Sequence, residues 1–454
     1  MADINPTSMA TQLATAYTQS AQSLITTQTK TAQTSSTALT KLQSALRAFE
    51  SSLTGLSGKS SLQQYAASFS STAYGTATAS STAQPGNYSV FVEQLATSNQ
   101  VAYADLPAVP VATGGPINVN LADGSSFSVN LSAADQDGDG TLSQAEIARS
   151  INQAAGNGGK VTAMIVTVGG SSQLVMSSGQ SGQNGAITLD ASGLPASTLK
   201  TSLSTPTQLV AAQDAVIWLG AQNTGIKVQQ GSNTFTSIPG VSMTFTQKMN
   251  TGDTPLTLTV ASDSSGTAAN VKTFVDAYNT LEKALDDLTK AGDAKTGTDA
   301  AVFASDSGVR ALRDRLSSTI RQSFGGLRLM DFGVSADRYG VLSLDTTKLN
   351  NAMAAHPGGL DQVFGKASLT TSSGVMGSLD KYMDVWLNSA TGQIKNRQTS
   401  VQQTQKSLTD RQTRLDAQYN NFYQRYLQQF SQLQTLQSQM SQTSGLMSNL
   451  FPSA

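Results

Sequence analysis

Acidic side chains are concentrated in one segment of the chain, from Asp135 to Glu146. Aspartates occupy its first, third and fifth positions, a glycine the sixth and a glutamate the twelfth. A hard divalent cation takes roughly six to eight oxygen ligands, and this is the spacing by which a calcium-binding loop supplies them. Closely spaced carboxylates also repel one another unless a cation neutralises them. The sequence therefore predicts a structural calcium site with the ligands Asp135, Asp137, Asp139, Thr141, Ser143 and Glu146.

A helix start offers an alternative explanation for part of the same segment. Ser143 and Glu146 have the spacing of a capping box, and Asp-Gly pairs commonly form turns. This alternative accounts for the turn and for two residues, but not for the three aspartates. Because a strand is expected before the loop, the element would be a calcium-clipped turn from strand to helix, without the helix pair that opens in regulatory calcium sensors.

Other residues that could carry catalysis are isolated in the sequence. His356 is the only histidine, and it lies in a turn-like Ala-Ala-His-Pro-Gly-Gly segment with no nucleophile motif beside it. The glycine pairs at 169–170 and 325–326 lack the spacing of a phosphate-binding or dinucleotide-binding loop. We therefore expect no catalytic residues and no enzymatic activity.

Composition argues against two classes of partner. Charged residues make up 13% of the chain and the formal net charge is −1, so no strong field attracts a polyanion such as nucleic acid. No apolar run reaches the ~18 residues that a membrane-spanning helix needs, and the N-terminus lacks the features of a cleavable signal peptide. We expect neither nucleic-acid binding nor membrane insertion. The absence of cysteine excludes a disulfide framework.

The two ends of the chain have helical periodicity. Near the C-terminus apolar side chains recur every seven residues in two registers, and such a narrow stripe is buried only against another helix. The expected interaction residues of this coiled coil are Val401, Leu408, Leu415, Tyr419, Phe422, Tyr426, Leu433 and Met440. Near the N-terminus, helical spacing is found among Met9, Leu13, Ala16, Leu24, Leu42, Leu46, Phe49, Leu53 and Leu56. Both ends are predicted to meet in one helical stem.

Between the helical ends the apolar period falls to two, which is typical of strands. The clearest case is a hairpin over 117–131 with Asp123-Gly124 at its turn, whereas 60–86 has the composition of an extended connector. The predicted fold class is α+β multidomain, with a discontinuous terminal coiled-coil stem, a mainly helical domain and two β-rich inserted modules. The predicted boundaries are 1–40 with 416–454 for the stem, 41–86 with 262–415 for the helical domain, 87–112 with 200–261 for the first β module, and 113–199 for the inserted β module that carries the acidic loop.

Short motifs along nearly the whole chain carry a family resemblance. They are Gly86-x-Tyr88-Ser89-Val90, Ala148-x-x-Ile151-Asn152, Ser232-Asn233-Thr234, Ile238-Pro239-Gly240-Val241, Phe274-Val275-x-Ala277-Tyr278-Asn279 and Asp331-Phe332-Gly333-Val334. In this order they resemble the bacterial flagellar filament cap family, also called flagellar hook-associated protein 2. The chain departs from the family's Gly-rich SGLD-like opening, and its acidic loop is an addition that the family pattern does not include.

The resemblance implies a secreted structural protein of the bacterial flagellum, located at the distal filament tip. It implies a homo-oligomer ring that retains exported flagellin and promotes its folding and polymerisation, and it implies the flagellar type III export apparatus and an export chaperone as further partners. Two alternatives are a secreted calcium-dependent adhesin that binds a host surface receptor, and a filament or hook-junction structural subunit. A cap should form closed rings, a filament subunit open fibres, and an adhesin monomers.

Overall fold

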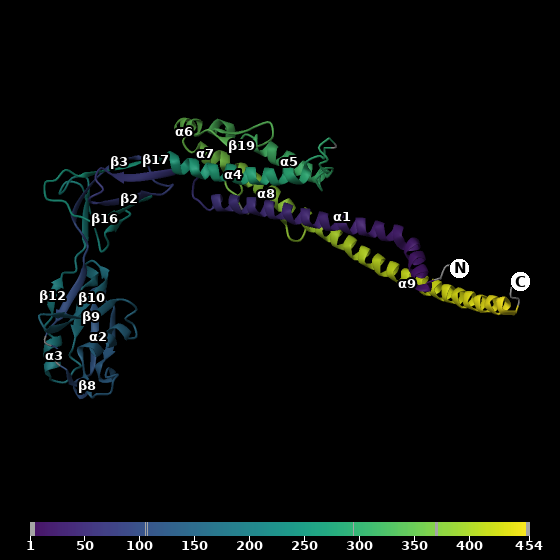
Figure 1. Ribbon diagram of the computed structural model, residues 1–454. Helices are drawn as coiled ribbons and strands as arrows, with labels where there is room; N and C mark the ends of the chain where they lie inside the picture. Colours follow the sequence, from purple (N-terminus) through teal and green to yellow (C-terminus); the bar gives the residue numbers. More distant parts are fainter. Residues whose placement is uncertain (1–4, 105, 107, 294, 368–370, 451–454) are drawn as a thin grey trace. The chain divides into compact units, whose positions relative to one another are not determined.

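The computed structural model describes residues 5–104, 106, 108–293, 295–367 and 371–450. Its contacts separate two compact units, whose helices and strands are labelled in Figure 1. The first unit combines the two ends of the chain, up to Leu62 and from Thr267 onward, and the second spans Gln63–Gly266. The observed architecture is the predicted α+β multidomain fold, in which the β-rich unit is an insertion between helical segments.

Two long helices form the ends of the chain, α1 (Pro6–Ser57) and α9 (Gln393–Leu450). The Asn5 side chain accepts a hydrogen bond from the Ser8 amide at the start of α1, and Gly58 follows its end. The Thr-rich first half of α1 is continuous with the second half. Its threonine hydroxyls donate to carbonyls one turn earlier, as Thr27 does to Ser23, and α9 packs along it. Within the described ranges, no helix is long and apolar enough to cross a membrane.

The rest of the first unit is a helical domain with one dense core. Its elements are α4 (Ser264–Thr289), α5 (Ser307–Ile320), the 3-10 turn Leu329–Phe332, the hairpin β18 (Val334–Ala336) and β19 (Leu342–Leu344), α6 (Thr346–Ala355), α7 (Gly359–Phe364) and α8 (Gly374–Leu387). The second half of α1 enters this core, where the Phe49 ring lies 6.2 Å from the Tyr278 ring. Phe274 packs edge-on against Phe364 at 5.2 Å.

The second unit contains two separate hydrophobic cores. The first lies between a five-stranded sheet, ordered β1 (Gln64–Phe69), β17 (Leu256–Asp263), β3 (Gly86–Gln94), β13 (Ala215–Leu219) and β14 (Ile226–Gln230), and a three-stranded sheet, ordered β15 (Thr234–Phe235), β16 (Val241–Phe245) and β2 (Gly75–Ala79). The connector expected over 60–86 is therefore wrong. Residues in this range form β1 and β2, which pair with strands far along the chain, so the helical domain ends at Leu62 rather than at 86 and resumes at Thr267 rather than at 262.

The second core belongs to a module inserted into the first. Its sheets are β12 (Thr207–Val210), β4 (Ser98–Tyr103), β10 (Ser171–Ser181) and β9 (Val161–Val168); β11 (Ile187–Asp190), β6 (Pro116–Leu121) and β7 (Ser126–Asn130); and the pair β5 (Val109–Pro110) and β8 (Thr141–Leu142). Two helices complete it, α2 (Gln144–Gln153) and α3 (Thr198–Leu203). The predicted limits of 113–199 are too narrow, because β4 and β12 pair with each other inside this module.

Candidate functional site

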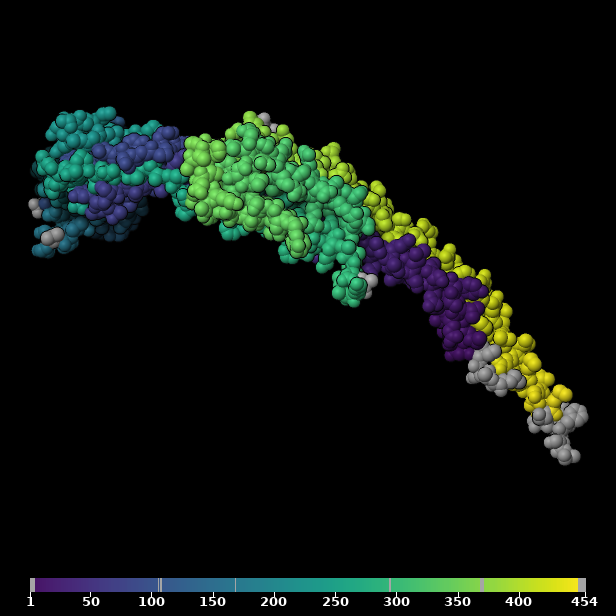
Figure 2. All heavy atoms as spheres, turned by 90° about the horizontal axis from the view of Figure 1, so that it is seen from above, coloured from purple at the N-terminus to yellow at the C-terminus, as the bar shows by residue number. Residues whose placement is uncertain are grey.

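The two terminal helices run antiparallel and form the predicted stem. Amide side chains bridge them along its length: Gln22 and Gln412 exchange two hydrogen bonds of 2.8 and 3.1 Å. Arg411 donates to Gln28 at 2.8 Å, and Gln398 donates to Gln43 at 3.1 Å. As the residue number rises on α1 it falls on α9, and Figure 2 shows α1 in purple lying along the yellow α9. Head and tail of the chain therefore share one two-helix element.

The heptad positions of α9 divide into two groups in the structure. Leu408 and Leu415 are buried against α1, with exposed fractions of 5% and 6%. Val401 packs against the helical-domain core, and Tyr419, Phe422 and Tyr426 are partly buried. Leu433 and Met440 are 44% and 60% exposed, since they lie near and past the level of Pro6, where α1 begins. For these two residues an interaction role stays a prediction.

The N-terminal side of the stem differs from the predicted stripe. Met9 and Leu24 are exposed, at 37% and 50%, and Ala16 is exposed as well. The buried positions in the first half of α1 are instead Ala10, Ala14, Thr18, Ile25 and Ala32. Small side chains let two helix backbones approach closely, so the contact depends on alanines that a search for large apolar residues overlooks. In the second half, the predicted leucines and Phe49 are buried.

Sequence reasoning missed Tyr17, which joins the predicted seam residues Phe422 and Tyr426 in an aromatic cluster between the two helices. The ring centroid of Tyr17 in α1 lies 5.4 Å from that of Phe422 and 5.9 Å from that of Tyr426. The Arg425 guanidinium lies over both α9 rings, at 5.1 and 4.9 Å. The hydrogen bond from Tyr17 and the nearby Arg425 lower the pKa of Tyr426 from its ordinary value. The tyrosine in an otherwise Thr/Ser/Gln-rich segment was the available signal.

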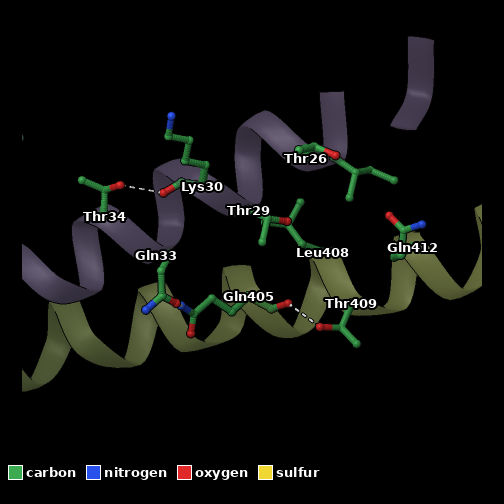
Figure 3. A pocket seen from close by; sticks show the side chains of 10 residues that line it. Thr26, Thr29, Lys30, Gln33, Thr34, Gln405, Leu408, Thr409 and Gln412 are labelled. Carbon is green, nitrogen blue, oxygen red and sulfur yellow. Dashed lines mark hydrogen bonds between the residues drawn. The ribbon is translucent and has the colours of Figure 1, made fainter. Parts of the chain in front are cut away.

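Shallow grooves follow the stem on both sides of its seam. One has a volume of about 770 Å³, and Figure 3 shows its lining from both helices. Thr34 donates to the Lys30 carbonyl and Thr409 to the Gln405 carbonyl, so their hydroxyls are engaged along their own helices. The second groove includes Gln28, Ser35 and Arg411. Linings of amides, hydroxyls and methyl groups suit another polypeptide better than a small reactive molecule.

The acidic loop brings its three aspartates together. Carboxylate oxygens of Asp135, Asp137 and Asp139 lie within 4.8 Å of one another. Asp135 accepts backbone hydrogen bonds from Gly138 at 2.7 Å and Gly140 at 3.0 Å. Both glycines have positive φ, 74° and 80°, which the tight turn requires. The clustered carboxylates fit the oxygen ligands that a hard cation prefers.

Glu146 and Ser143 form the capping box that was the alternative explanation. Ser143 accepts from the Glu146 amide, and Glu146 accepts from the Ser143 amide at 2.9 Å and its hydroxyl at 2.8 Å. The other carboxylate oxygen of Glu146 accepts from the Gln136 amide at 2.9 Å. These donors lower the pKa of Glu146 to about 2. Thr141 lies in β8 and donates its hydroxyl to Asp139. The capping box is present, and calcium binding by the six predicted ligands stays a prediction.

Comparison with known proteins agrees with this geometry. The family model of the flagellar hook-associated protein 2 C-terminus matches residues 212–442, and that of its N-terminus matches residues 2–99. The chain is 36% identical over 382 residues to the lateral flagellar hook-associated protein 2 of Vibrio parahaemolyticus, covering 83% of this chain and 84% of the relative. It is 29% identical to the B-type flagellar hook-associated protein 2 of Pseudomonas aeruginosa, covering 89% of this chain and 86% of the relative.

A solved structure has the same architecture. The D1-D2-D3 domains of the flagellar cap protein from Escherichia coli align with a TM-score of 0.64 and 25% sequence identity. The alignment covers 80% of this chain and 99% of that structure. The matches to both family models and to a relative of 36% identity lead to one assignment. The chain belongs to the flagellar hook-associated protein 2 family.

Proposed function

We propose that this protein is the cap at the distal tip of the bacterial flagellar filament, where it retains exported flagellin and promotes its folding and polymerisation. The observation that carries the proposal is the union of both chain ends in one antiparallel stem, in a chain whose ends match the two family models. The role is structural rather than enzymatic, and the protein acts outside the cell.

The cap works as a homo-oligomer ring. The solved Escherichia coli relative is described as a flagellar cap protein, and the stem of this chain offers surface for further helices. Exposed apolar side chains occur on both stem helices, namely Met9, Tyr17, Leu24, Leu433, Leu436 and Met440. Single exposed apolar residues are ordinary on a protein surface, but a heptad seam that continues past its partner needs another helix.

Three further partners are proposed, two on the family resemblance and one on the alternative role as a secreted adhesin. The flagellar type III export apparatus and an export chaperone would deliver the chain to the filament tip. A host surface receptor would be a third partner, which the β-rich unit would contact. Immunoprecipitation from the producing cell, followed by mass spectrometry, tests the export apparatus and the chaperone, and the same capture from host-cell membranes tests the receptor.

Deletion and complementation test the cap proposal. A strain that lacks this protein should release unpolymerised flagellin into the medium and lose motility. The wild-type chain should restore both, whereas Leu415→Asp should not, because a charge is placed in the buried seam of the stem. Gln424→Asp on the exposed face of the same helix is the matched control and should complement fully. Normal filaments in the deletion strain would contradict the proposal.

We further propose that the acidic loop holds a structural calcium ion. Support comes from the clustered aspartates and from a spacing that a capping box leaves unexplained. Calcium titration into chelator-treated protein should give one binding event and a rise in Tm, both lost in Asp135→Ala. Asp190→Ala, which removes an aspartate that accepts from the Ser192 amide in the same module, should keep both. Equal binding by wild type and Asp135→Ala would refute the site.

A further inference from the structure

One edge of the four-stranded sheet in the inserted module is closed over only half of its length. β9 is the edge strand of this sheet, whose order is β12, β4, β10, β9; Figure 1 labels β12, β10 and β9. Two asparagine side chains occupy the outer edge where a neighbouring strand would lie. Asn157 bonds both the amide and the carbonyl of Val161, each at 2.9 Å. Asn152, from α2, bonds the carbonyl and amide of Ala163 at 2.7 and 2.8 Å.

These bonds fix which backbone groups of β9 point outward. In an antiparallel ladder, residues that face the partner strand alternate with residues that face away. The backbone N–H and C=O groups of Val161 and Ala163 point away from β10, so those of Ile165 and Thr167 point away from it as well. Throughout the described part of the chain, no segment is paired with the outward backbone groups of these two residues. The open edge therefore begins where the asparagine contacts end.

The open half of β9 lacks the features that normally prevent an edge strand from pairing with another strand. Natural edge strands are usually short, charged, bulged or interrupted by proline. The opposite edge, β12, is short and has a register shift beside Leu209. β9 has eight residues in regular register with β10 and carries no charged side chain. Met164 and Val166 on its solvent face are 45% and 37% exposed. β9 and β10 are joined by Gly169-Gly170, both with positive φ, so the open half of β9 lies next to a narrow hairpin tip.

We propose that this edge pairs with the same edge of a second copy of the chain, in antiparallel register about a two-fold axis at Val166. In that register Ile165 of each copy lies opposite Thr167 of the other, so the outward groups of both residues exchange four backbone hydrogen bonds. The two Val166 side chains meet at the axis, and the exposed Met164 side chains flank them on the same face. The two four-stranded sheets then form one sheet across the pair.

The second copy is favoured as occupant by three features of the segment. The open backbone groups are self-complementary: Ile165 and Thr167 lie on either side of Val166, so the segment matches its own reversed copy. The segment has no charge, so two copies do not repel each other. Finally, in this register Ala163 falls opposite position 169 of the other hairpin tip, so the pairing ends at the point where the asparagines already satisfy the edge.

The pairing is distinct from the contact that closes a ring. A two-fold contact uses the same patch on both chains and is complete with two chains, whereas a ring needs two different patches. It therefore joins two unassembled chains, or two assemblies. An overlap of about five residues buries much less surface than the ~1,200–2,000 Å² of a stable interface. Pairing should therefore depend on concentration and should strengthen when several copies act together.

Cysteine cross-linking of the full-length chain tests the register. The chain has no cysteine of its own, so Val166→Cys introduces a single thiol. Directly opposite residues in a non-hydrogen-bonded pair have Cα atoms ~4.5 Å apart, within the range that a disulfide spans. Mild oxidation should convert Val166→Cys to a disulfide-linked dimer at least tenfold faster than Ile226→Cys, a more exposed position on the edge strand β14. Equal rates at the two positions would overturn the proposal.

Charge exchange tests the identity of the occupant. Val166→Lys and Val166→Glu should each abolish the concentration-dependent dimer in sedimentation velocity, and a one-to-one mixture of the two variants should restore it as a heterodimer. Thr167→Pro should weaken the dimer as well, because it removes an outward donor and leaves the ladder to β10 intact. Failure of the mixture to restore pairing, or capture of an extended heterologous peptide with no self-pairing, would show that another polypeptide occupies the edge.

Discussion

The two halves of α1 are held by different kinds of contact, although they belong to one continuous helix. In the first half the buried side chains are mainly small, and glutamine pairs bridge to α9 beside them. In the second half Leu42, Leu46, Phe49 and Leu53 are at most 1% exposed in the helical-domain core. Burying a large apolar side chain contributes about 1.5–3 kcal/mol, whereas a typical hydrogen bond contributes about 0.5–1.5 kcal/mol net. The second half of α1 is therefore held by the helical-domain core, whereas the first half depends on its partner helix α9.

The difference has a structural counterpart at the base of α9. Arg397 binds both carboxylate oxygens of Asp306, with one contact of 2.9 Å, and lies 5.4 Å over the Trp386 ring. This bidentate pair fixes α9 to the helical domain before it leaves that domain to form the stem. With a base packed into the domain and a narrow, polar stem beyond it, the stem can open locally without unfolding the helical domain.

The largest predicted effect is a difference in stability loss between substitutions of two aromatic residues of α1. Phe49→Ala should destabilise the helical domain by about 3–5 kcal/mol, because a ring that is 1% exposed leaves a cavity. Tyr17→Ala removes a ring that is 63% exposed and should cost about 0.5–1.5 kcal/mol, the value of its ring contacts. Chemical unfolding followed by near-UV circular dichroism measures both. Similar losses for the two variants would remove the distinction between the halves of α1.

The same contrast decides what could be predicted from the sequence. The α9 seam was predicted because Leu408, Leu415 and Phe422 repeat every seven residues, and periodicity is a local property. The first half of α1 was placed in the wrong register, since Met9 and Leu24 have large apolar side chains and the residues that pack, such as Ala14, have small ones. Hydrophobicity identifies large buried residues and gives no signal for close helix contact through alanine.

Strand pairing over long distances was also beyond local inference. β1 and β2 consist largely of Ser, Ala, Thr and Tyr. They are strands because β17 and β16, which lie far later in the sequence, offer them partners. By contrast, the hairpin of β6 and β7 was predicted, since its Asp-Gly turn and alternation lie within one short segment. The acidic loop shows a further limit: spacing places Asp135, Asp137 and Asp139 together, but occupancy by an ion is not written in the sequence.

A smaller effect is predicted within the stem itself. Leu415→Ala should cost at most ~2 kcal/mol, the low end for a buried leucine, because the seam is narrow enough to close partly. Hydrogen exchange should rise in both stem helices and stay unchanged in α4 and α5. Leu433→Ala is the matched control and should leave exchange unaltered, since Leu433 is 44% exposed. A strong effect of Leu433→Ala would instead show that another chain covers this part of α9 in solution.

The smallest predicted effect concerns two carboxylates of the helical domain with opposite pKa shifts. Burial, and then the nearby Asp380, raise the pKa of Glu50 in α1; Asp384 acts in the same direction and Arg47 against it. The bond to Arg397 is the main cause of the lowered pKa of Asp306. Thermal unfolding of Glu50→Gln and Asp306→Asn, each scanned from pH 3 to pH 8, distinguishes the two. The asparagine variant keeps a good helix cap at α5 and loses the charge.

The signs of the two pH effects are opposite. A raised pKa means that Glu50 stabilises the fold below the pKa of the unfolded chain, ~4.3, and that this contribution is lost as pH rises through the folded value. Glu50→Gln should therefore gain a few tenths of a kcal/mol at pH 7 and nothing at pH 3. Asp306 contributes above the unfolded value of ~3.9, and the contribution is lost as pH falls, so Asp306→Asn should be destabilised at pH 7 and match wild type at low pH. If Glu50→Gln lost stability at pH 7, the carboxylate would have to be bound favourably where α1 meets α8, and the base of the stem would be held by charge rather than by its apolar core.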